Sequence, residues 1–585
     1  MKKTSEGAVQ QYWADLMIEE LIRLGVDYFC ISPGSRSAPL TLAVSGNKSA
    51  KSFVHFDERA VAYHAMGYAA AKKGGAAIIT TSGTAVANLL PAVVEASKKK
   101  LPLVILTADR PVELRHTGAN QTIEQVNIFG SYVRWNFDIT VPAEQIKPTF
   151  ILSTVDQAVH RSKGEWPGPV HLNCMFREPL YTESKESVPK AYKQLLNSWS
   201  RSGKPFTEYV RASGQLSKDQ IWKMTDLINL SVAGLIVTGK LPDESSRDQI
   251  VKLAEKLNWP IFPDITSGLR LGQRSNHIIF NYDQIVDHLQ FNFDTVLHFG
   301  GRITSKRFYT LLEKTQPKTY LMVLNHPLRN DPQHGVTHRV QCHAGDFCRA
   351  VLPGLKKKAD PSILPKLKKL DQSVSVYLDK HLTQSETITE PGICRSVTRL
   401  IPPNHILYAA SSLPIRELDM FADHTGGSVS VGANRGASGI DGTIASAAGY
   451  SAGTNKRATL IAGDLSFLYD LNALSMLKDL INPMVIVLLN NDGGGIFEFF
   501  PVSKSGAVYK KYFETPHGLT FQKAAELFDL EYNRPNSMTE FESAYLKGVK
   551  SQKSVIIEIL TEKQENFNFQ QQLRRHIKAL IRGDV

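Results

Sequence analysis

The sequence lacks the features that define membrane-spanning, disulfide-rich and zinc-finger proteins. Its 585 residues include only five cysteines and no C-x-x-C pair, which argues against a disulfide framework or a zinc site. No apolar run approaches the roughly eighteen residues that a membrane-spanning helix needs. The opening MKKTSEGAVQQYW has lysines but no apolar stretch behind them. These absences predict a soluble, cytoplasmic protein with no stable membrane insertion.

Basic side chains are in excess, with a formal net charge of +12. Such an excess suits nucleic acid, an anionic membrane surface or small anionic ligands. Lysine runs such as 97–100 are simplest as solvated faces, and no motif that reads RNA or DNA accompanies them. We therefore expect small-molecule anions as ligands and no nucleic acid.

The length and the pattern of apolar residues predict several α/β domains. A chain that is 42% hydrophobic and 21% charged is ordinary globular material, and at this length it predicts roughly two to four domains. Strand-length apolar runs alternate with amphipathic helical segments, as in parallel α/β domains. A polar stretch at 181–194 and a basic, proline-containing stretch at 352–369 separate three such blocks. We predict three domains, 1–190, 191–365 and 366–585, each with a mostly parallel sheet flanked by helices.

The predicted strands follow the apolar runs of each block. They are DYFCISPG, SFVHF, GAAIITTSG and LPLVILTADRP in the first block, VAGLIVTGK, TVLHFGGRI and TYLMVLNH in the second, and HILYAAS, ATLIAGD and PMVIVLLNND in the third.

The stretch GDLSFLYDLNALSMLKDLINPMVIVLLNNDGGGIF, residues 463–497, predicts a ligand site. It reads as strand, helix and strand, so a right-handed crossover makes the strands parallel and brings Asp464 and Asn491 to the same sheet edge. A carboxylate, an amide oxygen and backbone carbonyls are hard oxygen donors that suit Mg²⁺. Glycines 493–495 let a bulky anion approach the backbone. The competing interpretation is that Asp, Asn and Gly simply end strands and turn the chain.

The order GD, about two dozen residues, then NN resembles the thiamine diphosphate motif. The resemblance implies that Asp464, Asn491 and the carbonyl of Gly493 bind Mg²⁺, or Mn²⁺ in its place, on the cofactor's diphosphate. Leu465 stands where the broad motif has glycine, and this departure resembles one branch of the superfamily. The stretch TTSGTAVANLLPAVVEA, with Gly83, resembles the segment beside the cofactor. Ile496 and Phe497 would pack on the cofactor, although as apolar residues they equally suit an ordinary core.

Thiamine diphosphate needs a carboxyl group that exchanges a proton with N1′ of its aminopyrimidine ring. In HFDERAVAYHAMGYA the candidate is Glu58, which follows a strand and opens a helix; it looks like the activating glutamate of this superfamily. The alternative is an ordinary acid at a helix N-terminus, a role that Asp57 could equally fill. His55 and His64 are interpreted as structural.

Five motifs spread over most of the chain, in its first and third blocks, indicate the branch. They are CISPGSRSAPLTLA, HFDERA, TADRPVELRHTGANQTI, NRGASGIDGTIASAAG and GDLSFLYDLNAL, and together they closely resemble the SEPHCHC synthases of menaquinone biosynthesis. In that family the three domains are pyrimidine-binding, central and diphosphate-binding. The resemblance implies a thiamine diphosphate-dependent transferase that joins 2-oxoglutarate to isochorismate with decarboxylation. It also implies a homodimer, or a dimer of dimers, with sites at subunit interfaces.

Both substrates are dianions, so the site needs fixed cations, and arginine binds carboxylates best. By resemblance, one set of residues lines the isochorismate side: Arg36, Arg110, Asn120, Gln121, Lys306 and Arg307. Ser412, Arg416 and Arg435 would hold the succinyl carboxylate. Taken singly, each arginine suits a surface or interdomain ion pair instead.

Two other functions stay open on the sequence. Another thiamine-dependent decarboxylase or carboligase, such as an acetohydroxyacid synthase, would share the metal motif but lack SPGSRS and NRGASGIDG. A non-catalytic anion-binding or nucleic-acid-binding protein would use the basic charge without binding thiamine diphosphate.

Overall fold

The computed structural model describes residues 6–72, 74–181, 188–210, 215–241, 243–272, 274–289, 292–356 and 363–582. These residues form two compact units. The first consists of the described residues within Met1–Arg211, Asn434–Asn455 and Tyr469–Asn482, and the second of those within Ala212–Ala433, Lys456–Leu468 and Pro483–Val585.

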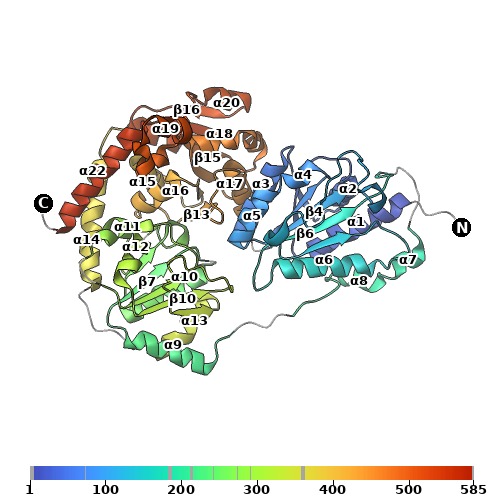
Figure 1. The fold of residues 1–585 in the computed structure, drawn as a ribbon, viewed down its shortest axis with the longest axis horizontal. Helices are drawn as coiled ribbons and strands as arrows, with labels where there is room; N and C mark the ends of the chain where they lie inside the picture. The colour runs from blue at the N-terminus through green and yellow to red at the C-terminus, as the bar shows by residue number, and fades with distance from the viewer. Residues whose placement is uncertain are drawn as a thin grey trace. The chain divides into compact units, whose positions relative to one another are not determined.

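The first unit is built on a six-stranded parallel sheet in the order β2-β1-β3-β4-β6-β5 (Figure 1). The strands are β1 (Tyr28–Ile31), β2 (Lys51–Val54), β3 (Ala76–Thr80), β4 (Leu103–Asp109), β5 (Asn136–Ile139) and β6 (Pro169–Met175). Helices α1 (Glu6–Arg23), α2 (Ala38–Gly46) and α6 (Thr149–Ser162) share one apolar core with one face of the sheet. Helices α3 (Glu58–Ala71) and α5 (Leu90–Lys99) also contact the strands and contribute no residue to that core.

Small residues allow α3 to pack closely against α17 (Thr443–Thr454), which belongs to the same unit. A Cβ atom on Gly67 would lie 2.1 Å from the Ser446 carbonyl oxygen, and one on Gly449 would lie 1.9 Å from that of His64. Larger side chains at either glycine would push the helices apart. This packing fixes the helix that begins at Glu58.

The second unit contains a six-stranded parallel sheet with the order β13-β12-β14-β15-β17-β16. Its strands are β12 (Ile406–Ala409), β13 (Ser430–Ala433), β14 (Ala458–Gly463), β15 (Met484–Asn490), β16 (Glu531–Asn533) and β17 (Val555–Leu560). Helices α15 (Glu390–Leu400), α16 (Leu413–Phe421) and α21 (Met538–Gly548) share its core. Numbered from its own first strand, this sheet repeats the strand order of the first sheet, so both carry a topological switch point between their first and third strands.

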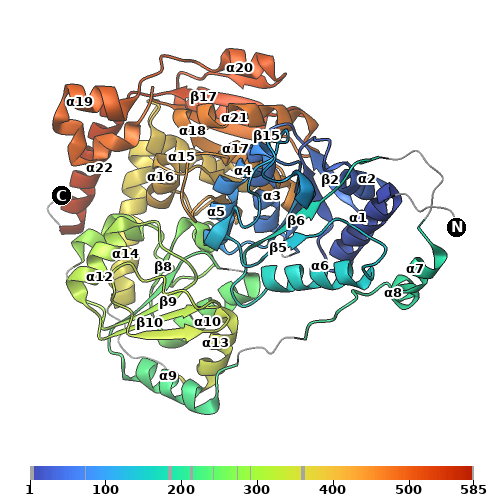
Figure 2. The ribbon, with the colours of Figure 1, turned by 45° about the vertical axis from the view of Figure 1, so that its right-hand side comes forward.

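The second unit also contains a five-stranded parallel sheet in the order β11-β10-β9-β7-β8 (Figure 2). Its strands are β7 (Gly234–Thr238), β8 (Ile261–Pro263), β9 (Thr295–Phe299), β10 (Thr319–Leu324) and β11 (His338–Gln341). Helices α9 (Lys218–Leu230), α10 (Glu244–Leu257) and α13 (Ala344–Val351) share one core with it. Another core joins it to α11 (Tyr282–Ile285), α12 (Lys306–Thr315), α14 (Ile363–Leu378) and α22 (Lys563–Arg582), and the last two helices lie side by side in both views.

The predicted α/β class, with three parallel sheets flanked by helices, is confirmed. The boundaries at 190 and 365 stay predictions, and the stretches expected to separate the domains fall partly outside the described residues, at 182–187 and 357–362. The helix expected between β14 and β15 is divided into α18 (Asp464–Tyr469) and the 3₁₀ helix η7 (Leu471–Asp479). None of the helices in the described part of the chain combines the length and apolar character that crossing a membrane would require.

Candidate cofactor and substrate site

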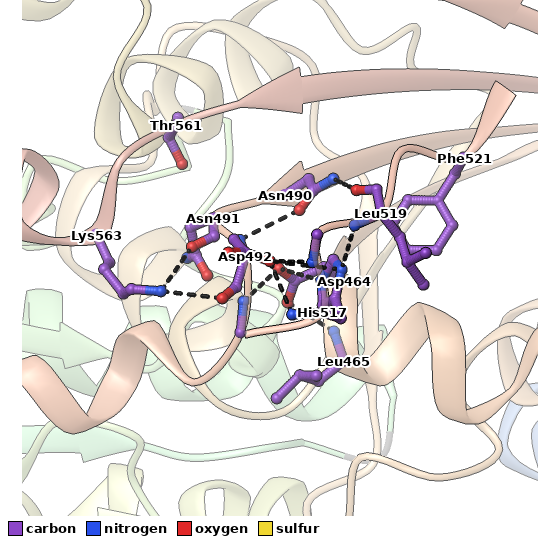
Figure 3. A network of polar contacts seen from close by, with 12 residues as sticks. Asp464, Leu465, Asn490, Asn491, Asp492, His517, Leu519, Phe521, Thr561 and Lys563 are labelled. Carbon is purple, nitrogen blue, oxygen red and sulfur yellow. Dashed lines mark hydrogen bonds and ion pairs between the residues drawn. The ribbon is translucent and has the colours of Figure 1, made fainter. Parts of the chain in front are cut away.

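The structure brings Asp464 and Asn491 to one edge of the sheet that β12–β17 form, which comes last in the chain and is called the third sheet below (Figure 3). Strands β14 and β15 pair in parallel up to Gly463 and Leu489, so the residues that follow them lie at the same carboxyl edge. Asp464 is 2% exposed and begins α18. Its Oδ2 accepts a hydrogen bond of 2.9 Å from the backbone N–H of Gly493. The juxtaposition that the strand–helix–strand pattern predicts is therefore present.

His517 orients the Asp464 carboxylate. The backbone N–H of Leu519 donates to His517 Nδ1 at 3.0 Å, so Nε2 carries the ring proton when the imidazole is neutral. Nε2 lies 3.2 Å from Asp464 Oδ2, and the N–H of Leu465 donates to Oδ1 at 2.6 Å. Such contacts around a ligating carboxylate fix its direction. His517 was not predicted, because no local pattern connects it with a carboxylate 53 residues earlier.

In the side-chain amide of Asn491, the nitrogen is hydrogen-bonded within the described part of the chain and the oxygen is not. Its Nδ2 donates to Glu390 Oε1 at 3.0 Å, whereas its Oδ1 is buried and has no hydrogen-bond partner among the described residues. A buried carbonyl oxygen without a partner is costly, and a cation would satisfy it. Together with the Asp464 carboxylate and the Gly493 carbonyl, this oxygen is a donor of the kind that Mg²⁺ prefers. The residues present therefore fit the predicted metal.

Gly493 requires its lack of a side chain. Its φ is +125°, and a Cβ atom would lie 2.1 Å from the carbonyl oxygen of Glu514. The neighbouring N–H of Gly494 donates to that same oxygen at 2.6 Å. The loop after β15 is thus closed against the segment around Glu514, and this contact shapes the candidate site.

Lys563, the first residue of α22, holds the same loop from the other side (Figure 3). Its Nζ donates to the carbonyl oxygens of Asn491 at 3.3 Å and Asp492 at 2.9 Å, and it lies 2.9 Å from Glu514 Oε1. Lys563 is only 8% exposed, so these three contacts replace much of the hydration of its ammonium group. The sequence does not reveal this role, because Lys563 opens an amphipathic helix in which lysine is commonplace.

The carboxyl group of Glu390 interacts with a second buried carboxyl group, that of Glu417. Glu390 and Glu417 are both buried, each has one carboxyl oxygen that receives no donor from the described residues, and their side chains interact. Burial raises the pKa of Glu417 well above its usual range, and the charge of Glu390 raises it further. Burial also raises the pKa of Glu390. One proton shared between the two carboxyl groups satisfies both free oxygens.

In the first unit, three predicted site residues follow neighbouring strands at their carboxyl ends. Arg36 follows β1, Gly83 follows β3 and Arg110 follows β4. Arg110 donates to Ser82 Oγ at 2.7 Å and to the Asn120 carbonyl at 2.8 Å. Gln121, which has a left-handed φ of +55°, donates to the Ser82 carbonyl at 3.1 Å. The structure thus gathers Gly83, Arg110, Asn120 and Gln121 around one strand end.

Arg36 is 6% exposed, and a neighbouring cation repels it. Burial lowers the pKa of Arg36, and the charge of Arg110 lowers it further. Its guanidinium donates to the Phe176 carbonyl at 2.9 Å and to the exposed Glu178 carboxylate at 3.3 Å. Two guanidinium groups close enough to repel one another favour a bound anion.

The two acids at the start of α3 have different roles. Asp57 is the helix cap, because its side chain accepts hydrogen bonds from the N–H groups of Arg59 at 3.0 Å and Ala60 at 3.2 Å. The capping role that would have explained Glu58 is therefore filled, and the half-buried Glu58 carboxylate has no part in it. Burial lowers the pKa of His64 to about 3, which agrees with its structural interpretation.

The residues expected to hold the succinyl carboxylate follow two strands of the third sheet. Ser412 follows β12 with a φ of +75°, which is strained for serine, and its carbonyl accepts a hydrogen bond from Arg416. Arg435 follows β13 in a loop of the first unit. In that loop Glu95, a residue of α5, accepts hydrogen bonds from three successive N–H groups, of Gly436, Ala437 and Ser438.

The remaining predicted residues have ordinary surroundings. Lys306 is exposed at the start of α12, and Arg307 is paired with Asp283 at 2.6 Å and Asp287 at 3.4 Å. Ile496 and Phe497 are half-buried in the 3₁₀ helix η8 (Gly495–Phe499), where the Phe497 ring packs edge-on against Phe513 with centroids 5.5 Å apart. The described residues hold no cluster of three His, Cys, Asp or Glu side chains that could form a different metal site.

Three family models match the chain. They are the N-terminal and C-terminal TPP binding domains of the thiamine pyrophosphate enzymes, over residues 12–128 and 425–559, and the thiamine pyrophosphate middle domain, over residues 190–409. With the parallel sheets and the Asp464–Asn491 edge, these matches place the chain among the thiamine pyrophosphate enzymes.

Curated relatives show to which family of thiamine pyrophosphate enzymes the chain belongs. Three are called 2-succinyl-5-enolpyruvyl-6-hydroxy-3-cyclohexene-1-carboxylate synthase. That of Rubrobacter xylanophilus is 44% identical, over 96% of this chain and 97% of its own. That of Salinibacter ruber is 40% identical over 97% of each chain, and that of Chlorobium phaeobacteroides is 38% identical over 97% and 98%. The chain belongs to the family of these synthases.

Proposed function

We propose that the protein forms 2-succinyl-5-enolpyruvyl-6-hydroxy-3-cyclohexene-1-carboxylate from 2-oxoglutarate and isochorismate, with release of CO₂. The near full-length similarity to synthases of that name supports the proposal most strongly. The alternative of an acetohydroxyacid synthase-like enzyme has no such support, and membership of an enzyme family disfavours a non-catalytic binding protein.

The third sheet supplies the metal and diphosphate site. Asp464, Asn491 through its unpaired Oδ1, and the carbonyl of Gly493 would hold Mg²⁺, with Mn²⁺ as a substitute. The glycines after β15 leave room for phosphate oxygens beside the backbone. Ile496 and Phe497, together with Gly83, would flank the cofactor. When bound, thiamine diphosphate supplies the electron sink for the decarboxylation.

Glu58 is the proposed proton donor and acceptor for the aminopyrimidine nitrogen. It is free for this role because Asp57 caps the helix, and its position is fixed by the close packing of α3 against α17. A carboxyl group held at a helix start can exchange one proton with the nitrogen without moving.

Fixed cations would bind the carboxylates of both substrates. Arg36 and Arg110, with Asn120 and Gln121, would face isochorismate; their mutual repulsion would be relieved by a dianion. Ser412, Arg416 and Arg435 would hold the succinyl carboxylate. Of the two residues at the start of α12, Lys306 is the better candidate, because Arg307 already pairs with two aspartates.

We further propose a homodimer or a dimer of dimers, in which each site combines Glu58 of one chain with Asp464 of another. A two-fold axis would create two equivalent sites per dimer. The family resemblance supports this arrangement.

The function is tested by CO₂ release. With isochorismate, Mg²⁺ and thiamine diphosphate present, 2-oxoglutarate should be consumed and pyruvate should not. Omission of either the metal or the cofactor should abolish the release. Consumption of pyruvate in preference to 2-oxoglutarate would overturn the proposed donor substrate.

A further inference from the structure

The side-chain amide of Asn491 can face the metal in two ways, and only one is useful. A primary amide has an oxygen that accepts and a nitrogen that donates, and a half-turn of the amide exchanges them. With Oδ1 toward the cation position the amide is a ligand, whereas with Nδ2 there it repels the cation. Something must therefore select the orientation.

Glu390 makes that selection in the structure. Its Oε1 accepts the hydrogen bond from Asn491 Nδ2 at 3.0 Å, and a carboxylate oxygen cannot do the same for Oδ1. The reversed amide would place two acceptors against one another inside the protein, where Glu390 is 1% exposed and Asn491 7%. The cost of that arrangement is high because no water can relieve it.

Glu390 is itself held from several elements. It is the first residue of α15, whose cap Thr389 accepts a hydrogen bond from the N–H of Gly392. Thr561, at the end of β17, donates its hydroxyl to the same Oε1 at 2.8 Å. The side chain of Glu417 in α16 also interacts with the Glu390 carboxyl group. The acceptor that faces Asn491 is thus fixed.

The backbone of Asn491 is positioned independently of Glu390. Lys563 binds the carbonyls of Asn491 and Asp492, and Asp464 binds the N–H of Gly493 (Figure 3). Removing Glu390 should therefore release the side-chain amide while the loop stays in place.

We propose that Glu390 is a positioning residue for the metal site: it holds the Asn491 amide with Oδ1 toward the cation and Nδ2 away from it. This inference rests on the proposed function, which makes Asn491 a metal ligand. Glu390 contacts neither the metal nor the substrates in this role and acts only through Asn491.

The test measures metal binding rather than turnover. Mg²⁺ is titrated into the purified full-length protein with thiamine diphosphate present, and the half-saturating concentration is read from the thermal unfolding midpoint. Glu390→Leu should raise that concentration about 10- to 100-fold, the usual effect of losing a contact behind a metal ligand. Glu390→Gln should stay near the parent, because its amide oxygen can face Asn491 and its nitrogen can face Glu417. Thr561→Val is the matched control: it removes a donor to the same oxygen without touching Asn491, and should also stay near the parent.

A double-mutant comparison separates orientation from general disruption. In an Asn491→Asp background both ends of the ligand are oxygens, so Glu390 opposes the second oxygen instead of selecting an orientation, and Glu390→Leu should lower the half-saturating Mg²⁺ concentration or leave it unchanged rather than raise it. An equal effect in both backgrounds, or parent-like Mg²⁺ binding by a folded Glu390→Leu protein, overturns the proposal. Should Glu390→Leu not fold, Glu390→Ala, which leaves room for water, takes its place in the same comparison. Failure of the parent protein itself to bind Mg²⁺ with the cofactor would instead refute the metal site of the proposed function, and this inference with it.

Discussion

Replacing Glu95 with alanine should weaken the binding of 2-oxoglutarate and leave that of isochorismate almost unchanged. Glu95 is 2% exposed, and its carboxylate accepts hydrogen bonds from the N–H groups of Gly436 at 2.7 Å, Ala437 at 2.5 Å and Ser438 at 3.1 Å. These N–H groups follow Arg435 directly, so the carboxylate holds the loop that presents this arginine. The residues proposed to face isochorismate lie outside this loop.

The size of the effect follows from the three hydrogen bonds that the substitution removes. A hydrogen bond to a charged group contributes about 1.5–3 kcal/mol, but water can reach the partly exposed loop when the carboxylate is gone. The flanks of the loop also stay attached, because Lys99 contacts Asn434 and Tyr63 donates to Asp441 at 2.6 Å. We therefore expect a loss of about 2 kcal/mol, which corresponds to roughly a 30-fold higher KM for 2-oxoglutarate.

The assay compares steady-state constants for both substrates. Glu95→Gln keeps one acceptor oxygen and should show a smaller rise, whereas Glu144→Ala, an exposed acid of the same unit, should behave as the parent. A folded Glu95→Ala protein with an unchanged KM for 2-oxoglutarate, or with equal rises for both substrates, would show that the loop does not depend on Glu95.

Four further predictions concern the metal site, the proton-transfer group, the subunit arrangement and a buried acid. Asp464→Ala should abolish Mg²⁺-dependent cofactor binding in a calorimetric titration; parent-like binding would mean that the metal lies elsewhere. Glu58→Gln should still bind the cofactor but slow hydrogen–deuterium exchange at the thiazolium C2 about a hundredfold or more, and an unchanged rate would remove its proposed role. Mixing these two inactive chains should restore some activity if each site combines two chains, whereas mixed dimers that stay inactive would place each site within one chain. Burial raises the pKa of Asp470 from 3.8 to about 7. The contribution of Asp470 to stability is therefore complete below pH 3.8 and is lost as the pH rises toward 7, by up to about 1.4 kcal/mol per pH unit. Asp470→Asn should flatten the plot of unfolding free energy against pH, and an equal slope in both proteins would contradict the raised pKa.

Local sequence patterns predict the strands that are continuous apolar runs bounded by small or polar residues. Among them are β14 and β15, which bring Asp464 and Asn491 together. The patterns missed five strands of three or four residues, β5, β8, β11, β13 and β16, which are too short to show a period, and the seven-residue β6. They also missed β17, whose apolar run VIIEIL contains the buried Glu558. That carboxylate is accommodated because Asn490 and Tyr532 both donate to it at 2.6 Å.

The residues that contact the candidate metal ligands cannot be predicted from local sequence patterns. Glu390 lies 101 positions before Asn491, and Lys563 lies 72 after it, yet both contact it. Contacts at such separations arise from the packing of whole helices and strands, and the residues next to each partner in the sequence do not indicate them. The choice between Asp57 and Glu58 was open for a different reason, since both acids suit a helix start and only the observed hydrogen bonds assign the cap to Asp57.

The proposed joining of 2-oxoglutarate to isochorismate is tested by the mass of the product formed from uniformly ¹³C-labelled 2-oxoglutarate and unlabelled isochorismate, with Mg²⁺ and thiamine diphosphate. The proposed reaction should give 2-succinyl-5-enolpyruvyl-6-hydroxy-3-cyclohexene-1-carboxylate with four labelled carbons, and one labelled CO₂ for each molecule formed. Labelled CO₂ accompanied only by free succinic semialdehyde, or an adduct that retains all five labelled carbons, would contradict it.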